Sequence, residues 1–266
     1  MDYIDIGVNL LDSSFEEDRD EVIDRAFNSA VQILINTSSS MEDSVRSLNL
    51  AKKYPSKIFT TAGIHPHNAS TGDNSLKESL TRMLQNDCMV AIGECGLDYF
   101  RNLSPKDKQL SVFKTHLEVA KETGLPLFLH QRDAHEDFTN CLNEVLDSPI
   151  HGVAHCFTGN IDQMNAYLDM GLYIGITGWI CDERRNADLI KAVKHLPLDK
   201  VLIETDSPYL IPRSLKNVRR NEPMNLSIIA EKLADEMGIE HSQLANQSVI
   251  NSKNCLLYTS PSPRDA

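Results

Sequence analysis

Residues 89–130 read MVAIGECGLDYFRNLSPKDKQLSVFKTHLEVAKETGLPLFLH, and this stretch decides the fold. Apolar and β-branched residues fill its two ends, 89–94 and 125–130, as they do in buried strands. Between them, residues 106–123 place apolar side chains three and four positions apart, which is typical of a helix with one face on a core. Gly124 then stands where a helix ends in a left-handed C-cap. The stretch therefore predicts a strand–helix–strand unit.

The same alternation of apolar runs and amphipathic runs recurs along the chain. About eight strand–helix units in roughly 250 residues is the number found in a closed (β/α)₈ barrel. The strands are continuously apolar, which indicates parallel strands covered on both faces. A doubly wound open sheet would need a phosphate-binding GxGxxG after an early strand, and the sequence has none. We therefore predict an α/β protein, a single TIM barrel, with strands at 3–8, 31–36, 58–63, 89–94, 125–130, 152–155, 172–176 and 201–204.

Composition limits the classes of protein that remain. The 266 residues are 41% hydrophobic, an ordinary globular value, and the formal net charge of −12 excludes a broad basic surface that coats duplex DNA. A local basic patch is still compatible with this charge. The six cysteines form no CxxC pair, which indicates reduced thiols. No apolar run is long enough to span a membrane and the N-terminus is acidic, so we expect a cytoplasmic protein, without a membrane partner and monomeric.

The last twelve residues differ from the rest of the chain. Residues 255–266 read CLLYTSPSPRDA and break the helical pattern of 244–253. They resemble the translation of a sequencing adapter read through at the end of a DNA fragment. We therefore expect one domain over 1–254, followed by a disordered, non-native tail at 255–266.

Acidic and imidazole side chains stand at the ends of the expected strands. The gaps from 65 to 94, 94 to 130 and 130 to 155 are 29, 36 and 25 residues, each close to one βα unit of roughly 30 residues. The spacing therefore places these side chains at one end of the barrel, the C-terminal face on which barrel active sites lie. The set comprises His65, His67, Glu94, His130, His155 and Asp206.

A single histidine at a strand end is more often a core or capping residue than a ligand. Several buried acids and imidazoles together would carry large desolvation and repulsion costs, which a divalent cation relieves. We therefore predict Glu94, His130 and His155 as metal ligands, with Asp206 as a ligand or a general base. Carboxylate and imidazole ligands suit Mg, Mn or Zn alike. Such a cation would activate water and polarise a carbonyl or phosphoryl oxygen.

Six ordered motifs carry a resemblance to a known family. GIHPH, AIGECGLD, HQRDAHE, HCFTG, YIGITGWICDERR and LIETDSPYL, within residues 2–254, resemble the TatD family of metal-dependent nucleases. The resemblance implies a TIM barrel of the metal-dependent amidohydrolase type, with Mg as the usual cation, that hydrolyses DNA phosphodiesters. In the branch that these motifs resemble, it implies a 3′-to-5′ exonuclease on single-stranded DNA or RNA, whose role in degradation or DNA repair stays open.

The motifs also assign residues, with one departure. Glu94, His130 and His155 match the metal ligands of the family, and Asp206 matches its acidic ligand or proton acceptor. The family's HxH after the first strand is replaced by Gly7 and Asn9 in this chain. We therefore expect a more open, oxygen-rich site rather than a tightly held pair of metals.

Other polar residues have two interpretations each. We predict catalytic roles for Glu94, Asp206 and His65, the last holding the scissile phosphate or assisting proton transfer. His67 either contacts substrate or is a loop residue only. Arg132 either binds phosphate or pairs with Asp133 or Glu136.

The loops after the seventh and eighth strands carry further candidates. Arg219 and Arg220 either follow substrate phosphates or form solvated ion pairs, with Glu222 nearby. Trp179 and Tyr209 either stack on a base or, for Trp179, fill a structural position. The alternative functions are hydrolysis of a small amide, lactone or cyclic substrate on the same barrel, and a silent binding scaffold.

Overall fold

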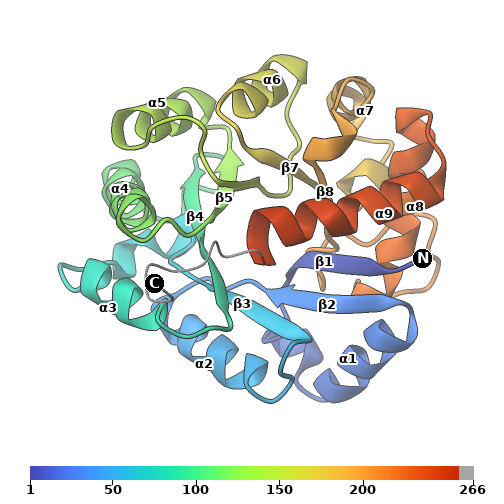
Figure 1. Cartoon of the computed structure of the whole chain (residues 1–266), viewed down its shortest axis with the longest axis horizontal. Helices are drawn as coiled ribbons and strands as arrows, with labels where there is room; N and C mark the ends of the chain where they lie inside the picture. The colour runs from blue at the N-terminus through green and yellow to red at the C-terminus, as the bar shows by residue number, and fades with distance from the viewer. Residues whose placement is uncertain (258–266) are drawn as a thin grey trace, which may run out of the picture.

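Eight parallel strands form the centre of the molecule. The computed structural model describes residues 1–257, and in it each strand pairs with the next along the chain, in the order β1 to β8 (Figure 1). A parallel bridge between Val8 and Ser207 joins the end of β1 to the segment after β8, so the barrel is nearly closed. The predicted TIM barrel is confirmed. The strands are β1 Tyr3–Val8, β2 Val31–Asn36, β3 Ile58–Ala62, β4 Met89–Asp98, β5 Leu127–Arg132, β6 Gly152–Ala154, β7 Tyr173–Ile176 and β8 Val201–Ile203.

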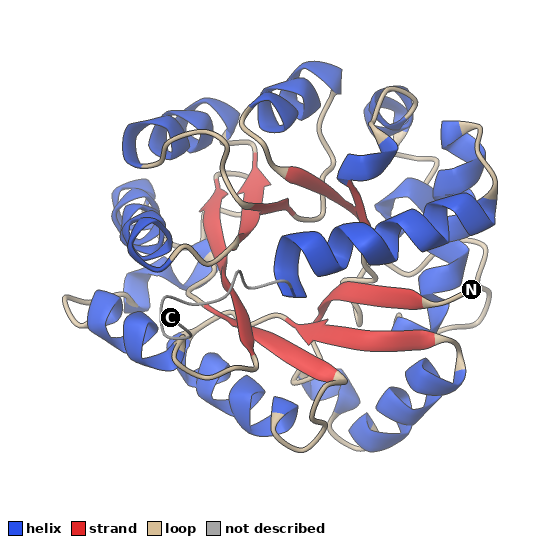
Figure 2. Cartoon of the chain, viewed as in Figure 1, coloured by secondary structure: helices blue, strands red, loops and turns tan. Residues whose placement is uncertain are grey.

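Helices surround the strands, as Figure 2 shows in blue around red. Local sequence explains several helix ends: Asn160 and Gln163 form a capping box at the start of α6, and Gly124 ends α4 in the left-handed conformation with φ of 70°. Within residues 1–257, no helix combines the length and apolarity that a membrane span requires. The helices are α1 Arg19–Asn28, α2 Met41–Ala51, α3 Leu76–Met83, α4 Lys106–Thr123, α5 His135–Val145, α6 Ile161–Asp169, α7 Ala187–Val193, α8 Leu226–Met237 and α9 His241–Ser252.

Strand β4 is longer than the sequence predicts. Residues 95–98 continue to pair with β5, up to Asp98 opposite Arg132. Gly96 makes this pairing possible, because it has φ of 144° and a Cβ there would collide with the carbonyl oxygen of His130. The extension carries Asp98 to the C-terminal end of the barrel, beside Glu94.

The barrel interior is filled by a cluster of buried apolar side chains from several strands. It contains Ile6, Phe128 and Leu202 together with Cys255 and Leu256 near the end of the chain. Phe128 lies directly beneath the site described below, because its ring centroid is 4.8 Å from that of His155. The interior is therefore solid below the C-terminal face.

The end of the described chain closes the opposite mouth of the barrel. Asn251 of α9 donates hydrogen bonds to the carbonyls of Leu198 and Val201, where β8 begins, and α9 lies against β1 and β8 (Figure 1). A π-helical turn, Lys253–Leu257, then buries Cys255 and Leu256. Apolar packing thus continues past the predicted boundary at residue 254, into the first residues of the expected tail. Residues 258–266 of that tail lie outside the described residues.

Candidate active site

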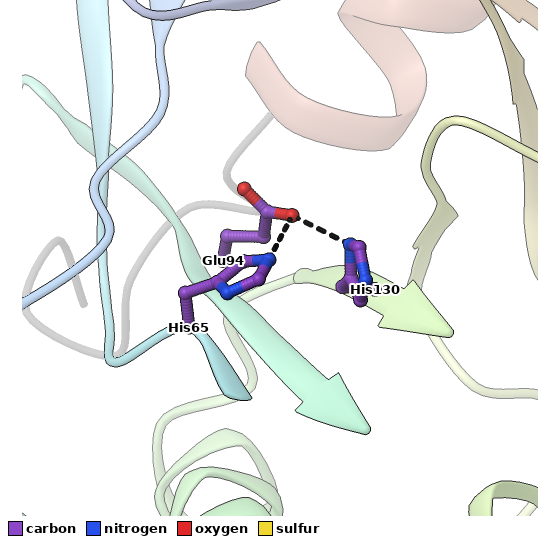
Figure 3. Close-up of side chains that lie close together, drawn as sticks. All are labelled: His65, Glu94 and His130. Carbon is purple, nitrogen blue, oxygen red and sulfur yellow. Dashed lines mark hydrogen bonds and ion pairs between the residues drawn. The ribbon is translucent and has the colours of Figure 1, made fainter. Parts of the chain in front are cut away.

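Side chains from four neighbouring strand ends meet around one carboxylate oxygen. Oε1 of Glu94, in β4, lies 2.8 Å from Nε2 of His155, which follows β6, and 2.9 Å from Nδ1 of His130, in β5. The same oxygen lies 3.2 Å from Nε2 of His65, which follows β3. Figure 3 shows His65 and His130 both directed at this oxygen. The structure thus brings together four residues that chain spacing placed at one end of the barrel.

Two further carboxylates complete the cluster. Nε2 of His130 lies 3.3 Å from Oδ2 of Asp98, and Nδ1 of His155 lies 3.2 Å from Oε2 of Glu204. Each of these two imidazoles therefore lies between Glu94 and a second carboxylate. Such outer carboxylates fix the orientation of histidines that bind metals.

Asp98 and Glu204 were not assigned by the sequence, although both stand in quoted motifs. Asp98 lies four positions after Glu94 in one strand, and this even spacing puts both on the same face. Glu204 directly follows β8, at the level of the other site residues. The signal for Asp98 was hidden because the strand was expected to end at Glu94.

His67 and Asp206 also reach this part of the barrel. Nε2 of His67 lies 2.7 Å from Oδ2 of Asp98. Asp206 accepts a hydrogen bond of 3.0 Å from the side-chain amide of Asn9. The amide oxygen of Asn9 in turn accepts from the hydroxyl of Thr37 at 2.8 Å. Asn9 therefore orients Asp206, a role that the sequence did not predict.

The buried charges perturb one another strongly. Burial opposes ionisation of Glu94, but its interactions with His155, His65 and His130 outweigh burial and hold the pKa of Glu94 well below its usual range. Burial also opposes the charged form of His155, but Glu94 and Glu204 raise its pKa well above its ordinary value. For Asp206, burial and the charges of Glu94 and Glu204 outweigh His155 and raise the pKa to about 7.

The residues present fit a divalent cation. The donor atoms of His65, Glu94 and His130 all lie within 4.8 Å of one another, as carboxylate and imidazole ligands around one ion would. Burial raises the pKa of Asp206, and the negative charges of Glu94 and Glu204, which a cation would offset, raise it further. This set of three possible ligands includes His65, for which the sequence predicted a role in holding phosphate or in proton transfer.

A cleft of about 1020 Å³ opens above the cluster. Glu94, His65, His130, His155 and Asp206 all line it, and so do Asp98 and His67. Four arginines also line the cleft. Arg185 pairs with Asp182, whereas Arg46, Arg101 and Arg132 form no ion pair with a carboxylate among residues 1–257. In this part of the chain the predicted alternative for Arg132, a pair with Asp133 or Glu136, is therefore not formed.

The aromatic residues predicted to stack on a base have different environments. Trp179 is buried, with the guanidinium of Arg132 4.6 Å and that of Arg185 3.8 Å from its ring. Trp179 lines the cleft, but the low exposure of its side chain favours the structural alternative. Tyr209 is 53% exposed in the cleft, and its hydroxyl donates to Asp12 at 2.7 Å.

Arg219 and Arg220, predicted either to follow substrate phosphates or to form ion pairs, do not line the cleft. The guanidinium of Arg220 lies 2.5 Å from Asp18 and 3.0 Å from Glu222, and it covers the ring of Phe15 at 4.7 Å. Arg219 is exposed. For Arg220 the structure forms the ion pairs that the second interpretation describes, with Asp18 and Glu222.

Comparison with known proteins places these observations in one family. Residues 4–257 match the family described as TatD related DNase. The chain is 44% identical over 252 residues to a protein of Salmonella typhimurium named 3′-5′ ssDNA/RNA exonuclease TatD, covering 94% of this chain and 96% of that protein.

Solved structures agree with this match. The crystal structure of a TatD homologue from Escherichia coli K12 superimposes with a TM-score of 0.89 at 25% identity, covering 97% of this chain and 98% of the other. An uncharacterised amidohydrolase from Saccharomyces cerevisiae shares the fold alone, with a TM-score of 0.81 at 21% identity, 96% of this chain and all of the other. The chain therefore belongs to the TatD related DNase family.

Proposed function

We propose that this protein is a divalent-metal-dependent exonuclease that removes nucleotides from the 3′ end of single-stranded DNA or RNA. The observation that carries the proposal is the Glu94-centred cluster of carboxylates and imidazoles, lining one cleft with arginines that have no carboxylate partner among the described residues. The name of the Salmonella relative supports the polarity and the substrate. A hydrolase of small neutral amides or lactones would leave these arginines without a role.

The chain's own residues have distinct proposed tasks. Glu94, His65 and His130 would hold the cation, with His155 completing the ligand set and Asp206 binding the cation or accepting a proton from the attacking water. Asp98 and Glu204 would orient the histidines. When bound, the cation lowers the pKa of water and polarises a phosphoryl oxygen. We propose Mg, with Mn or Zn as alternatives, because several carboxylates surround the cluster and Gly7 and Asn9 supply no imidazole.

Phosphate groups would be held by the cleft wall. Arg132, Arg46 and Arg101 offer guanidinium groups suited to phosphate oxygens, and His67 is a further proposed contact. Three unpaired arginines in one cleft of a chain of net charge −12 are too few to coat a duplex, which favours a flexible single strand as the substrate. We also propose a monomer that works in the cytoplasm, where its six free cysteines stay reduced.

The test is digestion of an oligonucleotide labelled at its 5′ end, with Mg, Mn or Zn and with chelator. We expect a ladder of products shortened from the 3′ end, faster on a single strand than on a duplex, and none with chelator. Glu94→Gln keeps the size of the side chain and removes its charge, so it should reduce the rate at least about 100-fold. Activity that resists chelator, or that survives in Glu94→Gln, would contradict the proposal.

A further inference from the structure

The segment between β4 and α4 holds two large apolar side chains in solvent at the cleft. Phe100 is 61% exposed and Leu103 is 66% exposed, and both line the same cleft as Glu94. Single exposed apolar residues are ordinary, but two in one short segment on a cleft wall suggest a ligand that covers them. We call residues 99–105 the β4–α4 segment.

The backbone under these side chains is anchored. The Oδ1 atom of Asp98 accepts from the amide of Arg101 at 2.7 Å, while the other oxygen of Asp98 contacts the site histidines. The buried side chain of Gln109 donates to the carbonyls of Asp98 and Ser104, at 3.2 and 2.8 Å. Ser104 also donates to the carbonyl of His67 at 2.9 Å. The segment is thus fixed to the cluster, with Phe100 and Leu103 left free.

The surroundings of the segment indicate the chemistry of the ligand. The guanidinium of Arg132 lies 5.3 Å from the centre of the Phe100 ring, and Arg101 stands between the two apolar residues in the chain. Neither arginine has a carboxylate partner among residues 1–257. A ligand that matches both features has flat apolar faces joined by anionic groups, as an unpaired nucleic-acid strand does.

We propose that Phe100, supported by Leu103, is a platform on which an unpaired base of the substrate stacks while Arg101 and Arg132 hold the adjoining phosphates. This inference rests on the proposed exonuclease function and deepens it. It assigns recognition of the base to the β4–α4 segment rather than to Trp179, which is buried. Tyr209 follows β8, four strands away from β4 in the barrel, and would form the facing wall.

The experiment measures whether Phe100 senses the base. The full chain digests labelled (dT)₁₀ in the presence of two unlabelled competitors, (dT)₁₀ itself and a decamer of abasic deoxyribose phosphates. For the unchanged protein we expect the abasic decamer to inhibit about tenfold more weakly than unlabelled (dT)₁₀. The reason is that it has no base to stack, and stacking of one base on an aromatic side chain strengthens binding by about this factor. In Phe100→Ala the KM for (dT)₁₀ should rise about tenfold and the difference between the competitors should collapse. Phe100→Trp should restore it.

Ile250→Ala is the matched control, because Ile250 is 50% exposed on α9 and does not line the cleft. Ile250→Ala should leave unchanged both the KM for (dT)₁₀ and the difference between the two competitors. If Phe100→Ala leaves the KM unchanged, the platform is wrong and the apolar pair serves another ligand, such as a protein. If it weakens both competitors equally, Phe100 does not sense the base and the proposal is overturned. Absence of digestion by the unchanged protein would instead refute the proposed function.

Discussion

Asp5 of β1 accepts two hydrogen bonds from Thr205, 200 residues further along the chain, one from the backbone amide at 2.9 Å and one from the hydroxyl at 2.5 Å. The same hydroxyl lies 2.9 Å from Oγ of Ser207. Burial raises the pKa of Asp5 to about 8. A neutral carboxyl therefore joins the first strand to the segment after the last.

This pair predicts a pH dependence of stability. In the unfolded chain an Asp titrates near its ordinary pKa of about 3.9, so the folded protein binds this proton more tightly. The stabilisation is complete below about pH 4 and is lost as the pH rises toward 8. In urea unfolding, Asp5→Asn should gain stability relative to the unchanged protein by up to about 1.4 kcal/mol for each pH unit between 5 and 8. A difference that stays constant with pH would contradict the assignment.

Glu204 and Asp98 are predicted to act through the histidines that they contact. Glu204→Gln and Asp98→Asn should each weaken the apparent affinity for Mn or Mg about 10- to 100-fold, because the imidazole orientation is loosened. Calorimetric titration with Mn measures this without an activity assay. Glu78→Gln, on the exposed face of α3, is the matched control and should bind the cation normally. Equal affinity in all variants would show that these carboxylates do not orient the ligands.

Arg132 and Arg220 should behave differently. Arg132→Ala should raise the KM for a single-stranded oligonucleotide about tenfold and make it less sensitive to salt, because a phosphate contact is lost. Arg220→Ala should leave the KM unchanged and cost about 0.5–1 kcal/mol of stability, since its ion pairs with Asp18 and Glu222 are partly solvated. A raised KM in Arg220→Ala would show that Arg220 contributes to substrate binding.

Leu256 tests where the folded domain ends. It is buried in the apolar cluster inside the barrel, so Leu256→Ala should lower the free energy of unfolding by about 2–4 kcal/mol. Lys253→Ala, in the same turn but exposed, should change it little. Equal stability of the two variants in urea would show that the packing of the last turn does not contribute.

Most of the barrel and the centre of the site could be predicted from the sequence. The spacing of His65, Glu94, His130 and His155 by about one βα unit was sufficient, because parallel strands in a barrel end on the same face. Asp98 could not be placed in the site from the sequence, because its position depends on β4 continuing through Gly96. That continuation depends in turn on a close backbone contact with β5.

The features that the sequence could not indicate are long-range contacts. The partner of Arg220, Asp18, is 202 residues away, and no local pattern indicates that the two meet. Cys255 and Leu256 were assigned to the tail on the composition of the residues that follow them. Their side chains are buried in the interior of the barrel, which exists only in the folded protein.

The solid interior beneath His155 has a consequence for how a polymer is processed. Phe128 fills the space under the site and Leu256 helps to close the far mouth, so a strand cannot thread through the barrel. The cleft is open on one side only, and a free end of a strand enters such a cleft more easily than the middle of a strand does. Each released nucleotide therefore has to leave through the same opening by which the strand enters. The shortened strand can then advance by one nucleotide.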